Sequence, residues 1–312
     1  MSMLIRNARV LDENQDRMAA VLIEGAVIAD IIIDGPLPKA QIKLDAGGMV
    51  LTSAFIDMHV HLRDPGYPEK ETLESGCLAA AAGGFGSLVC MANTAPVLDS
   101  PEAAQQLHER SLHLGICDVY PVLSLSRGMN GTDTSHLAAL SPDICRKAGI
   151  RMLSEDGKDL EDFAVFAEAC KHAKRLGLPV SCHCDAGGIE AAQAKEAGEA
   201  RSVWSRIEEN NATKRVLELA RESGAHIHVA HVSTKEALEL IKTRKQELGI
   251  SCEATPHHCA LQEDTAEKLG SESFGRVNPP LRAAKDRLAL VQALSEGLVD
   301  AIATDHAPHT RK

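Results

Sequence analysis

The sequence predicts a (β/α)8 barrel of the TIM type, preceded by a small N-terminal β-domain. Short β-type runs alternate with helical stretches from residue 51 onward, and the alternation repeats eight times over about 250 residues, the usual length of such a barrel. Aromatic residues make up only 3% of the chain, so Ala, Leu, Ile and Val must fill the core, as is common where helices pack on a parallel sheet. An open doubly wound sheet is the alternative, because the number of strands alone does not close a barrel.

Residues 1–50 are predicted to form the β-domain, a partial β-sandwich. Three β-type runs, Leu4–Val10, Ala20–Ile23 and Val27–Ile33, are separated by turn residues and show little helical periodicity. The barrel is assigned to residues 51–312. The chain stops soon after the eighth predicted strand, where a barrel would continue with another helix, so we expect the C-terminal part of the domain to be missing.

The strands and helices of the barrel follow from apolar runs and from helix start and stop signals. The predicted strands are Leu51–His61, Ser87–Asn93, Asp118–Ser124, Gly149–Glu155, Pro179–Cys184, His226–Ser233, Ser251–His258 and Ala301–His306. The predicted helices are Glu69–Ala82, Pro101–Leu114, Glu161–Leu176, Ile207–Ser223, Lys235–Leu248 and Ala283–Glu296. Capping residues support several of them, namely Ser100 and Ser233/Thr234 at helix starts and Gly115, Gly177, Gly224 and Gly249 at helix ends.

The composition of the chain argues against some classes of function. The formal net charge is -11 and no basic run interrupts the acidic balance, so binding to nucleic acid or to a membrane surface is not expected. A small anionic substrate is compatible with the negative net charge, because a single arginine in a binding pocket affects such a substrate more than the electrostatic field of the whole protein does. The N-terminus lacks the apolar region of a secretory signal. Nine cysteines without a CxxC pair indicate reduced thiols and a cytoplasmic location.

A histidine pair ends the first predicted strand. His59 and His61 are two residues apart, so both point to the same side of a strand and converge on one metal ion. Imidazole suits zinc and similar ions. An isolated pair of this kind is also compatible with a purely structural role.

Four further ligand-type residues follow other strands. Asp156, His183, His231 and Asp305 lie at the carboxyl ends of the fourth, fifth, sixth and eighth strands, the face where barrel enzymes hold their active sites. Six ligands exceed the needs of one tetrahedral zinc and suit two metals that share a carboxylate and a hydroxide. Such a centre polarises a carbonyl and supplies a nucleophile without a serine or a cysteine.

Most of the remaining histidines are predicted to be structural or solvated, while His306 is predicted to neighbour the chemistry. His226 and His228 lie within the sixth strand, away from its rim. Those in helical or loop stretches are expected to be solvated, namely His108, His113, His136 and His172.

A set of motifs resembles one family along the whole chain. The motifs are DMHVHLR at 57–63, MANTAP at 91–96, SEDG at 154–157, HCD at 183–185, HVAHVST at 228–234, CEATPHH at 252–258, NPPLR at 278–282 and ATDHAPH at 303–309. In this order and spacing they resemble the type I dihydroorotases, a family of metal-dependent amidohydrolases.

The resemblance implies a metal centre with two zinc ions per chain. His59 and His61 would bind one zinc, His183 and His231 the other, and Asp156 together with a hydroxide would bridge them. The family has Asp-Asp-Gly where this chain has Glu155-Asp156-Gly157, so a role of Glu155 in replacing or assisting Asp156 stays open.

The resemblance also implies a catalytic residue and substrate contacts. Asp305 would coordinate metal and act as the general acid/base. Arg63, Asn93, Asn278 and His309 would contact the substrate. A guanidinium fork can clamp a carboxylate while Asn side chains read amides, which suits dihydroorotate.

The reaction implied is the reversible cyclisation of N-carbamoyl-L-aspartate to L-dihydroorotate in pyrimidine biosynthesis. A hydantoinase or allantoinase is an alternative, although those enzymes bridge their metals with a carboxylated lysine and the strand Ile150 to Ser154 contains none. A catalytically silent scaffold is another, although all six candidate ligands are present. A small-molecule substrate is expected, and a homodimer or an association with aspartate transcarbamoylase stays open.

Overall fold

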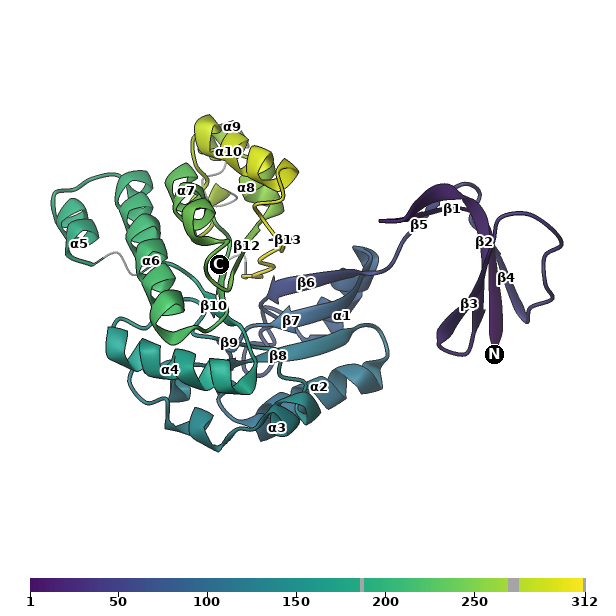
Figure 1. Ribbon diagram of the computed structural model, residues 1–312, viewed down its shortest axis with the longest axis horizontal. Helices are drawn as coiled ribbons and strands as arrows, with labels where there is room; N and C mark the ends of the chain where they lie inside the picture. Colours follow the sequence, from purple (N-terminus) through teal and green to yellow (C-terminus); the bar gives the residue numbers. More distant parts are fainter. Residues whose placement is uncertain (186–187, 269–274, 311–312) are drawn as a thin grey trace. The chain divides into compact units, whose positions relative to one another are not determined.

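The computed structural model describes residues 1–185, 188–268 and 275–310, which form two compact units, Met1–Phe55 and Ile56–Lys312 (Figure 1).

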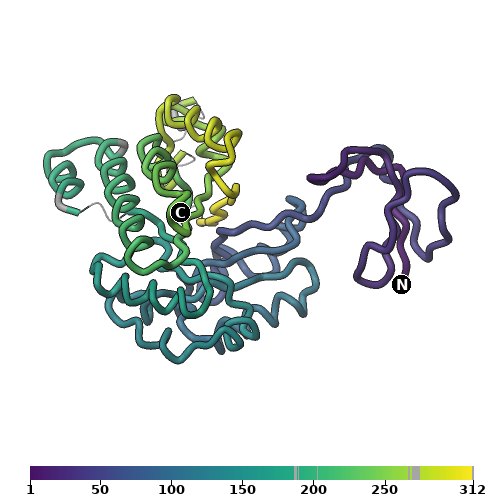
Figure 2. Tube along the Cα trace, viewed as in Figure 1, coloured from purple at the N-terminus to yellow at the C-terminus, as the bar shows by residue number. Residues whose placement is uncertain are grey.

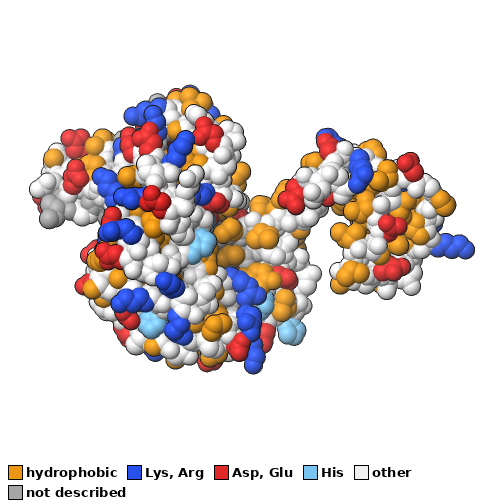
Figure 3. Space-filling model, in the orientation of Figure 1, with side chains coloured by type: hydrophobic (Ala, Val, Ile, Leu, Met, Phe, Trp, Pro, Cys, Tyr) orange, Lys and Arg blue, Asp and Glu red, His pale blue; other side chains and the backbone are white. Residues whose placement is uncertain are grey.

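The N-terminal unit is a five-stranded sheet with the order β3-β2-β1-β4, and β5 also pairs with β1. Its strands are β1 (Ser2–Asp12), β2 (Gln15–Glu24), β3 (Val27–Ile32), β4 (Ile42–Asp45) and β5 (Val50–Leu51). The three predicted runs are strands, and β1, β2 and β3 pair in antiparallel order. A small core of Ala8, Val10, Ala19 and Val21 holds the sheet. Hydrophobic side chains also show on its surface in Figure 3, and the exposed ones include Met18, Val27, Ile28 and Leu44.

The second unit contains an eight-stranded sheet whose strands follow the chain order. They are β6 (Phe55–Val60), β7 (Phe85–Cys90), β8 (Asp118–Ser124), β9 (Met152–Ser154), β10 (Val180–Cys182), β11 (Ile227–Val229), β12 (Ile250–Ala254) and β13 (Ala301–Ile302). Neighbouring pairs from β7 to β13 are parallel. All eight predicted strands are therefore present.

The sheet closes on itself between its first and last strands. Val60 forms a parallel bridge with His306, and the His61 N–H donates to the His306 carbonyl at 2.8 Å. The buried Asp57 carboxylate accepts from the Thr304 N–H at 3.0 Å and from the Thr304 hydroxyl at 2.5 Å. These contacts exclude the open sheet, so the predicted barrel is confirmed.

Helices follow the strands along the trace (Figure 2). They are α1 (Leu73–Ala82), α2 (Pro101–Leu114), α3 (Pro142–Lys147), α4 (Phe163–Leu176), α5 (Gly188–Glu196), α6 (Arg201–Ser223), α7 (Lys235–Arg244), α8 (Pro256–Ala260), α9 (Thr265–Lys268) and α10 (Ala284–Ser295). Ser100 and Thr234 cap α2 and α7 with their side chains, and α2, α4 and α6 end at left-handed glycines, as predicted. No helix among the described residues is long and apolar enough to span a membrane.

Several predicted boundaries are wrong. The sixth and eighth strands end at Val229 and Ile302 instead of Ser233 and His306, and the helix predicted from Ile207 begins at Arg201. Helix α7 ends at Arg244, capped by Lys245, and does not continue to Gly249. The seventh strand ends at Ala254 instead of His258. There Thr255 accepts from the His258 N–H and Pro256 occupies the first helical turn, so the chain turns into α8.

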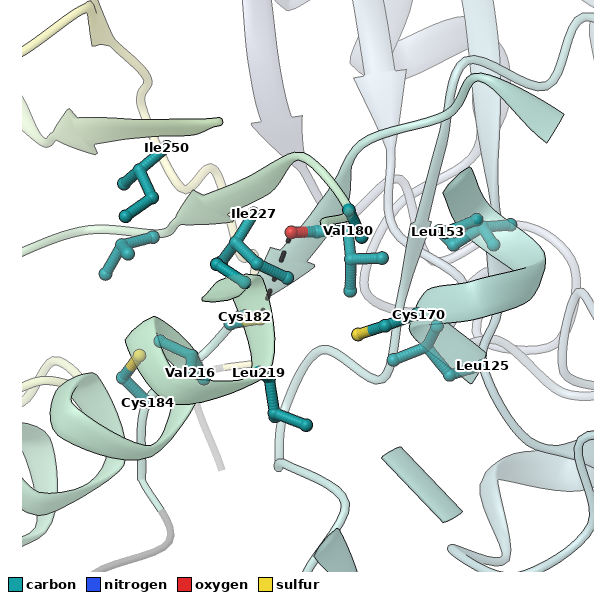
Figure 4. Close-up of a cluster of buried hydrophobic side chains, with 14 of the residues drawn as sticks. Leu125, Leu153, Cys170, Val180, Cys182, Cys184, Val216, Leu219, Ile227 and Ile250 are labelled. Carbon is teal, nitrogen blue, oxygen red and sulfur yellow. Dashed lines mark hydrogen bonds between the residues drawn. The ribbon is translucent and has the colours of Figure 1, made fainter. Parts of the chain in front are cut away.

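Side chains alternate between the two faces of the barrel wall. One set packs against the helices in a large apolar cluster, part of which is drawn in Figure 4: Leu125, Leu153, Cys170, Val180, Cys182, Cys184, Val216, Leu219, Ile227 and Ile250. A separate cluster contains Val89, Met91, Val122 and Met152, whose neighbours in β7 to β9 face the helices, so this second cluster fills the interior. On the face visible in Figure 3, acidic and basic side chains of this unit are interspersed.

Candidate metal centre

Residues from both sides of the barrel closure meet at the rim. His59 and His61 leave β6 on the same side, and Asp305 follows β13. The Asp305 Oδ1 atom lies 3.2 Å from His61 Nε2 and 3.6 Å from His59 Nε2. These three residues form one group that could hold a metal ion.

A second group surrounds Asp156. Its Oδ1 atom lies 3.2 Å from His59 Nε2 and 3.3 Å from His183 Nδ1, while Oδ2 lies 3.4 Å from His61 Nε2. His231 Nε2 lies 2.8 Å from His183 Nδ1, so these two rings face the same point beside Asp156. His59, Asp156 and His231 form the second group that could hold a metal. The structure thus brings all six predicted ligands together, with Asp156 between the two histidine pairs.

The nitrogen and oxygen atoms of this cluster suit the binding of a cation. His59 Nε2, Asp156 Oδ1 and His231 Nδ1 are buried and have no hydrogen-bond partner among the described residues, a costly condition for polar atoms unless a ligand satisfies them. Imidazole nitrogens and carboxylate oxygens form the donor set that zinc prefers. The residues therefore fit a metal centre.

Electrostatics at the rim point in the same direction. Burial alone would raise the pKa of Asp156, but the surrounding imidazoles of His59, His183 and His61 hold that pKa well below its ordinary value. Burial would also raise the pKa of Asp305, yet a hydrogen bond from His61 and the nearby rings lower it to about 2. Both carboxylates are thus negative at neutral pH. Despite burial, Asp156 raises the pKa of His59 well above its ordinary value and that of His183 to about 9, so protons balance this charge and a bound metal ion would replace them. Burial, with the neighbouring His183, lowers the pKa of His231 to about 3, so this ring is neutral and able to bind metal.

Several residues at the rim have left-handed backbone conformations, among them Cys184, which follows His183. Arg63, His231 and Asp305 have φ values of 60°, 31° and 51°. Such values are uncommon for residues other than glycine and cluster at functional sites. These turns direct the chain away from the strand ends, so the rim geometry does not follow from strand alternation alone.

The four predicted substrate contacts lie around this cluster. Asn93 Oδ1 accepts from His61 Nδ1 at 2.8 Å, and Asn278 Nδ2 lies 2.9 Å from His183 Nε2. Arg63 donates through Nε to the Pro308 carbonyl at 3.3 Å. Its Nη2 atom lies 3.5 Å from Nε2 of the exposed His309 ring, so a guanidinium and an imidazole lie side by side.

Glu155 and Asp156 take different places although they are adjacent. Both are buried, but Glu155 turns away from the rim. Its Oε2 atom accepts from the Ser126 N–H at 3.0 Å and its Oε1 atom from the Ser126 hydroxyl. Glu155 therefore anchors the loop after β8, and Asp156 alone of the two reaches the candidate ligands.

Two buried carboxylates beside the candidate ligands were not predicted from the sequence to be site residues. Glu253 accepts from His59 Nδ1 at 2.8 Å, and Asp57 accepts from the His59 N–H at 3.3 Å. The available signal was a charged residue inside an otherwise apolar strand. The prediction that His136 is solvated is wrong, because its ring is buried and lies 3.0 Å from the Ser124 carbonyl oxygen.

A buried ion pair braces the loops behind the rim. Arg282 of the NPPLR motif donates to Glu209 of α6 at 3.0 Å and to the Ser233 hydroxyl at 2.9 Å. Glu209 also accepts from the backbone N–H groups of Ser233 and Thr234 at 2.7 and 2.9 Å. This network joins the segment after His231 to the loop that carries Asn278.

A closed parallel barrel with a histidine and aspartate cluster at its carboxyl rim defines a metal-dependent amidohydrolase-type protein. A family model described as Dihydro-orotase-like matches residues 48–237. The chain is 36% identical to the dihydroorotase of Aquifex aeolicus over 317 residues, which cover 99% of this chain and 73% of that protein. It is also 36% identical to the dihydroorotase of Mycobacterium tuberculosis, covering 99% and 72%. The chain belongs to the dihydroorotase family.

Solved structures of related barrels are similar in fold. A dihydropyrimidinase from Brevibacillus agri superimposes with a TM-score of 0.84 at 26% identity, over 100% of this chain and 70% of that one. An L-hydantoinase from Arthrobacter aurescens gives 0.83 at 23% identity, over 98% and 69%, and this second likeness concerns the fold alone.

The adjacent carboxylates provide a matched pair of variants. We expect Asp156→Asn to lower the metal content of the purified chain by at least about one ion per chain, because it removes a charge shared by both groups of ligands. Glu155→Gln should retain the metal content of the unmodified protein. Elemental analysis after gel filtration measures both. Loss of metal in Glu155→Gln with retention in Asp156→Asn would reverse the assignment.

Proposed function

We propose that the chain is a cytoplasmic zinc-dependent dihydroorotase that interconverts N-carbamoyl-L-aspartate and L-dihydroorotate. The observation that carries this proposal is that all six candidate ligands lie together at one rim in a chain 36% identical to a dihydroorotase over 99% of its length. A missing ligand would favour a silent scaffold, and none of the six is missing.

We infer that the centre binds two zinc ions: His59 and His61 would hold one, His183 and His231 would hold the other, and Asp156 would contribute its carboxylate to both. Bound zinc supplies Lewis acidity for a carbonyl oxygen and lowers the pKa of water to about 7. Asp305 would be a further ligand, because its Oδ1 atom lies 3.2 Å from His61 Nε2 and 3.6 Å from His59 Nε2.

Asp305 would transfer the proton. Its carboxylate is charged at neutral pH because its pKa is about 2 despite burial. In the hydrolytic direction Asp305 accepts a proton from the attacking water and returns it to the ring nitrogen as the amide C–N bond breaks. The reverse sequence closes the ring.

The outer residues suit the substrate. Dihydroorotate carries a carboxylate, and the Arg63 guanidinium can receive it with charge-assisted hydrogen bonds beside His309. Asn93 and Asn278 have amide groups next to the ligands His61 and His183, within reach of a substrate seated on the centre.

A second candidate is another cyclic amidase, which the likeness to a dihydropyrimidinase at 26% identity supports. We expect the purified chain to hydrolyse L-dihydroorotate in preference to hydantoin, dihydrouracil and allantoin, with about two zinc ions per chain in the same sample. Preference for any of the other three would support the second candidate. Absence of both metal and turnover would support the scaffold.

The role of Asp305 is tested by Asp305→Asn. We expect turnover of dihydroorotate to fall by about 10²- to 10⁴-fold, the contribution typical of a general acid/base. Zinc content should stay largely intact, because the five other ligands remain. Asp300→Asn, a change at a partly exposed residue that pairs with Lys245, serves as the control and should retain activity. Unchanged turnover in Asp305→Asn would contradict the role.

The role of Arg63 is tested by Arg63→Met. Loss of a charged hydrogen bond costs about 1.5–3 kcal/mol, so we expect KM for dihydroorotate to rise roughly 10- to 100-fold. Arg146→Met removes an exposed guanidinium that pairs with Asp143, and its KM should equal that of the unmodified protein. A decrease in kcat at constant KM would assign Arg63 to another step.

A further inference from the structure

The inside of the barrel is polar near β11 and β12, in contrast to the apolar filling near β7 to β9. Ser251 and Glu253 alternate in β12 with residues of the large apolar cluster and therefore face the interior. His228 does the same in β11. Glu253 and His228 are only 1% and 2% exposed, so they are buried polar groups that require partners.

These groups form a continuous chain of hydrogen bonds that begins at a candidate metal ligand. His59 Nδ1 lies 2.8 Å from Glu253 Oε1, and Glu253 Oε2 lies 3.1 Å from His228 Nε2. His228 Nδ1 lies 2.8 Å from the Ser251 hydroxyl, which lies 2.8 Å from the exposed His226 Nε2.

The donors in this chain have one consistent direction. An ionised carboxylate only accepts, so His59 donates through Nδ1 and His228 through Nε2. His228 Nδ1 then accepts from the Ser251 hydroxyl, and the Ser251 oxygen accepts from His226. Within the part of the chain that the structure describes, His59 Nε2 has no hydrogen-bond partner, and it lies 3.2 Å from Asp156 Oδ1.

We propose that Glu253 is the positioning residue of the metal centre: it fixes His59 with its proton on Nδ1 and its Nε2 lone pair toward the metal, while His228 and Ser251 hold Glu253 from the barrel interior. Carboxylates that accept from a ligating imidazole orient the ring and increase its basicity. Glu253 Oε1 also lies 3.4 Å from the His231 backbone N–H and so braces a second ligand. The inference rests on the metal centre of the proposed function and not on its substrate.

The neighbouring ligand is oriented in another way. His61 Nδ1 donates to the neutral amide oxygen of Asn93 at 2.8 Å. Hydrogen bonds to a charged acceptor are roughly twice as strong as those between neutral groups. The hold on His59 is therefore the stronger of the two.

The test is the zinc affinity of the full chain, measured by competition with a chelator. Glu253→Gln preserves the shape of the side chain, but its amide group can accept from only one of the two imidazoles. We expect zinc affinity to fall about 10- to 100-fold. The control is Asp286→Asn, which alters an equally buried carboxylate that pairs with Arg206 and touches no candidate ligand. Its zinc affinity should stay within about threefold of the unmodified protein, whatever its Tm.

A double variant tests the order of the chain. We expect His228→Leu alone to weaken zinc binding by a smaller factor than Glu253→Gln, because Glu253 remains but loses one of its donors. If His228 acts through Glu253, Glu253→Gln/His228→Leu should bind zinc as Glu253→Gln does. Losses that multiply in the double variant would overturn the order.

The other outcomes also decide the matter. A zinc affinity within twofold of the unmodified protein in Glu253→Gln, or a loss no larger than that of Asp286→Asn, would overturn the positioning role. An unmodified chain that binds no zinc would overturn both this inference and the proposed function. Zinc binding without turnover of dihydroorotate would remove the proposed substrate alone, and the comparison of Glu253→Gln with its control would still stand.

Discussion

Closure of the barrel between β6 and β13 is the contact on which the metal centre depends. His61 and Asp305 are 244 residues apart and belong to opposite edges of the eight-stranded sheet, yet their ligand atoms lie 3.2 Å apart. The Val60–His306 bridge and the hydrogen bonds from Thr304 to Asp57 join those edges. Because parallel strands end on the same side, closure gathers the side chains that follow them into one ring.

The ring of candidate ligands lowers the stability of the fold locally. Buried polar atoms without partners, as at His59 Nε2 and Asp156 Oδ1, destabilise a fold, and left-handed backbone at Asp305 adds strain. Hydrogen bonds and an ion pair in the surrounding loops compensate for this loss of stability. Glu155 holds the loop after β8 through Ser126, and a buried ion pair holds the loops beyond β11, so rigid supports surround the few atoms left unsatisfied.

The sequence predicted the strands and the ligands because both follow local rules. An apolar run identifies a strand, and a His or Asp directly after it lies at the rim of a parallel barrel. Glu253 could not be found by that rule, since its importance arises from β6 and β11, which approach it only after folding. The contrast between Glu155 and Asp156 was also hidden, because adjacent residues differ here only in which partner each side chain reaches. His136 illustrates the same limit. Its ring is buried and lies 3.0 Å from the carbonyl oxygen of Ser124, 12 residues earlier, although the local sequence predicts a solvated ring.

The site has two layers whose structural causes differ. The candidate ligands His59 and Asp156 are buried, and His59 lies in β6 of the barrel wall. A barrel of this kind is shared with a dihydropyrimidinase that superimposes with a TM-score of 0.84 at 26% identity. Arg63 and His309 lie in loops, and Arg63 reaches its place through a left-handed turn and a bond to the Pro308 carbonyl. Loop residues are less constrained by the barrel and vary more readily. The buried candidate ligands therefore depend on the barrel, whereas the positions of Arg63 and His309 depend on these loops.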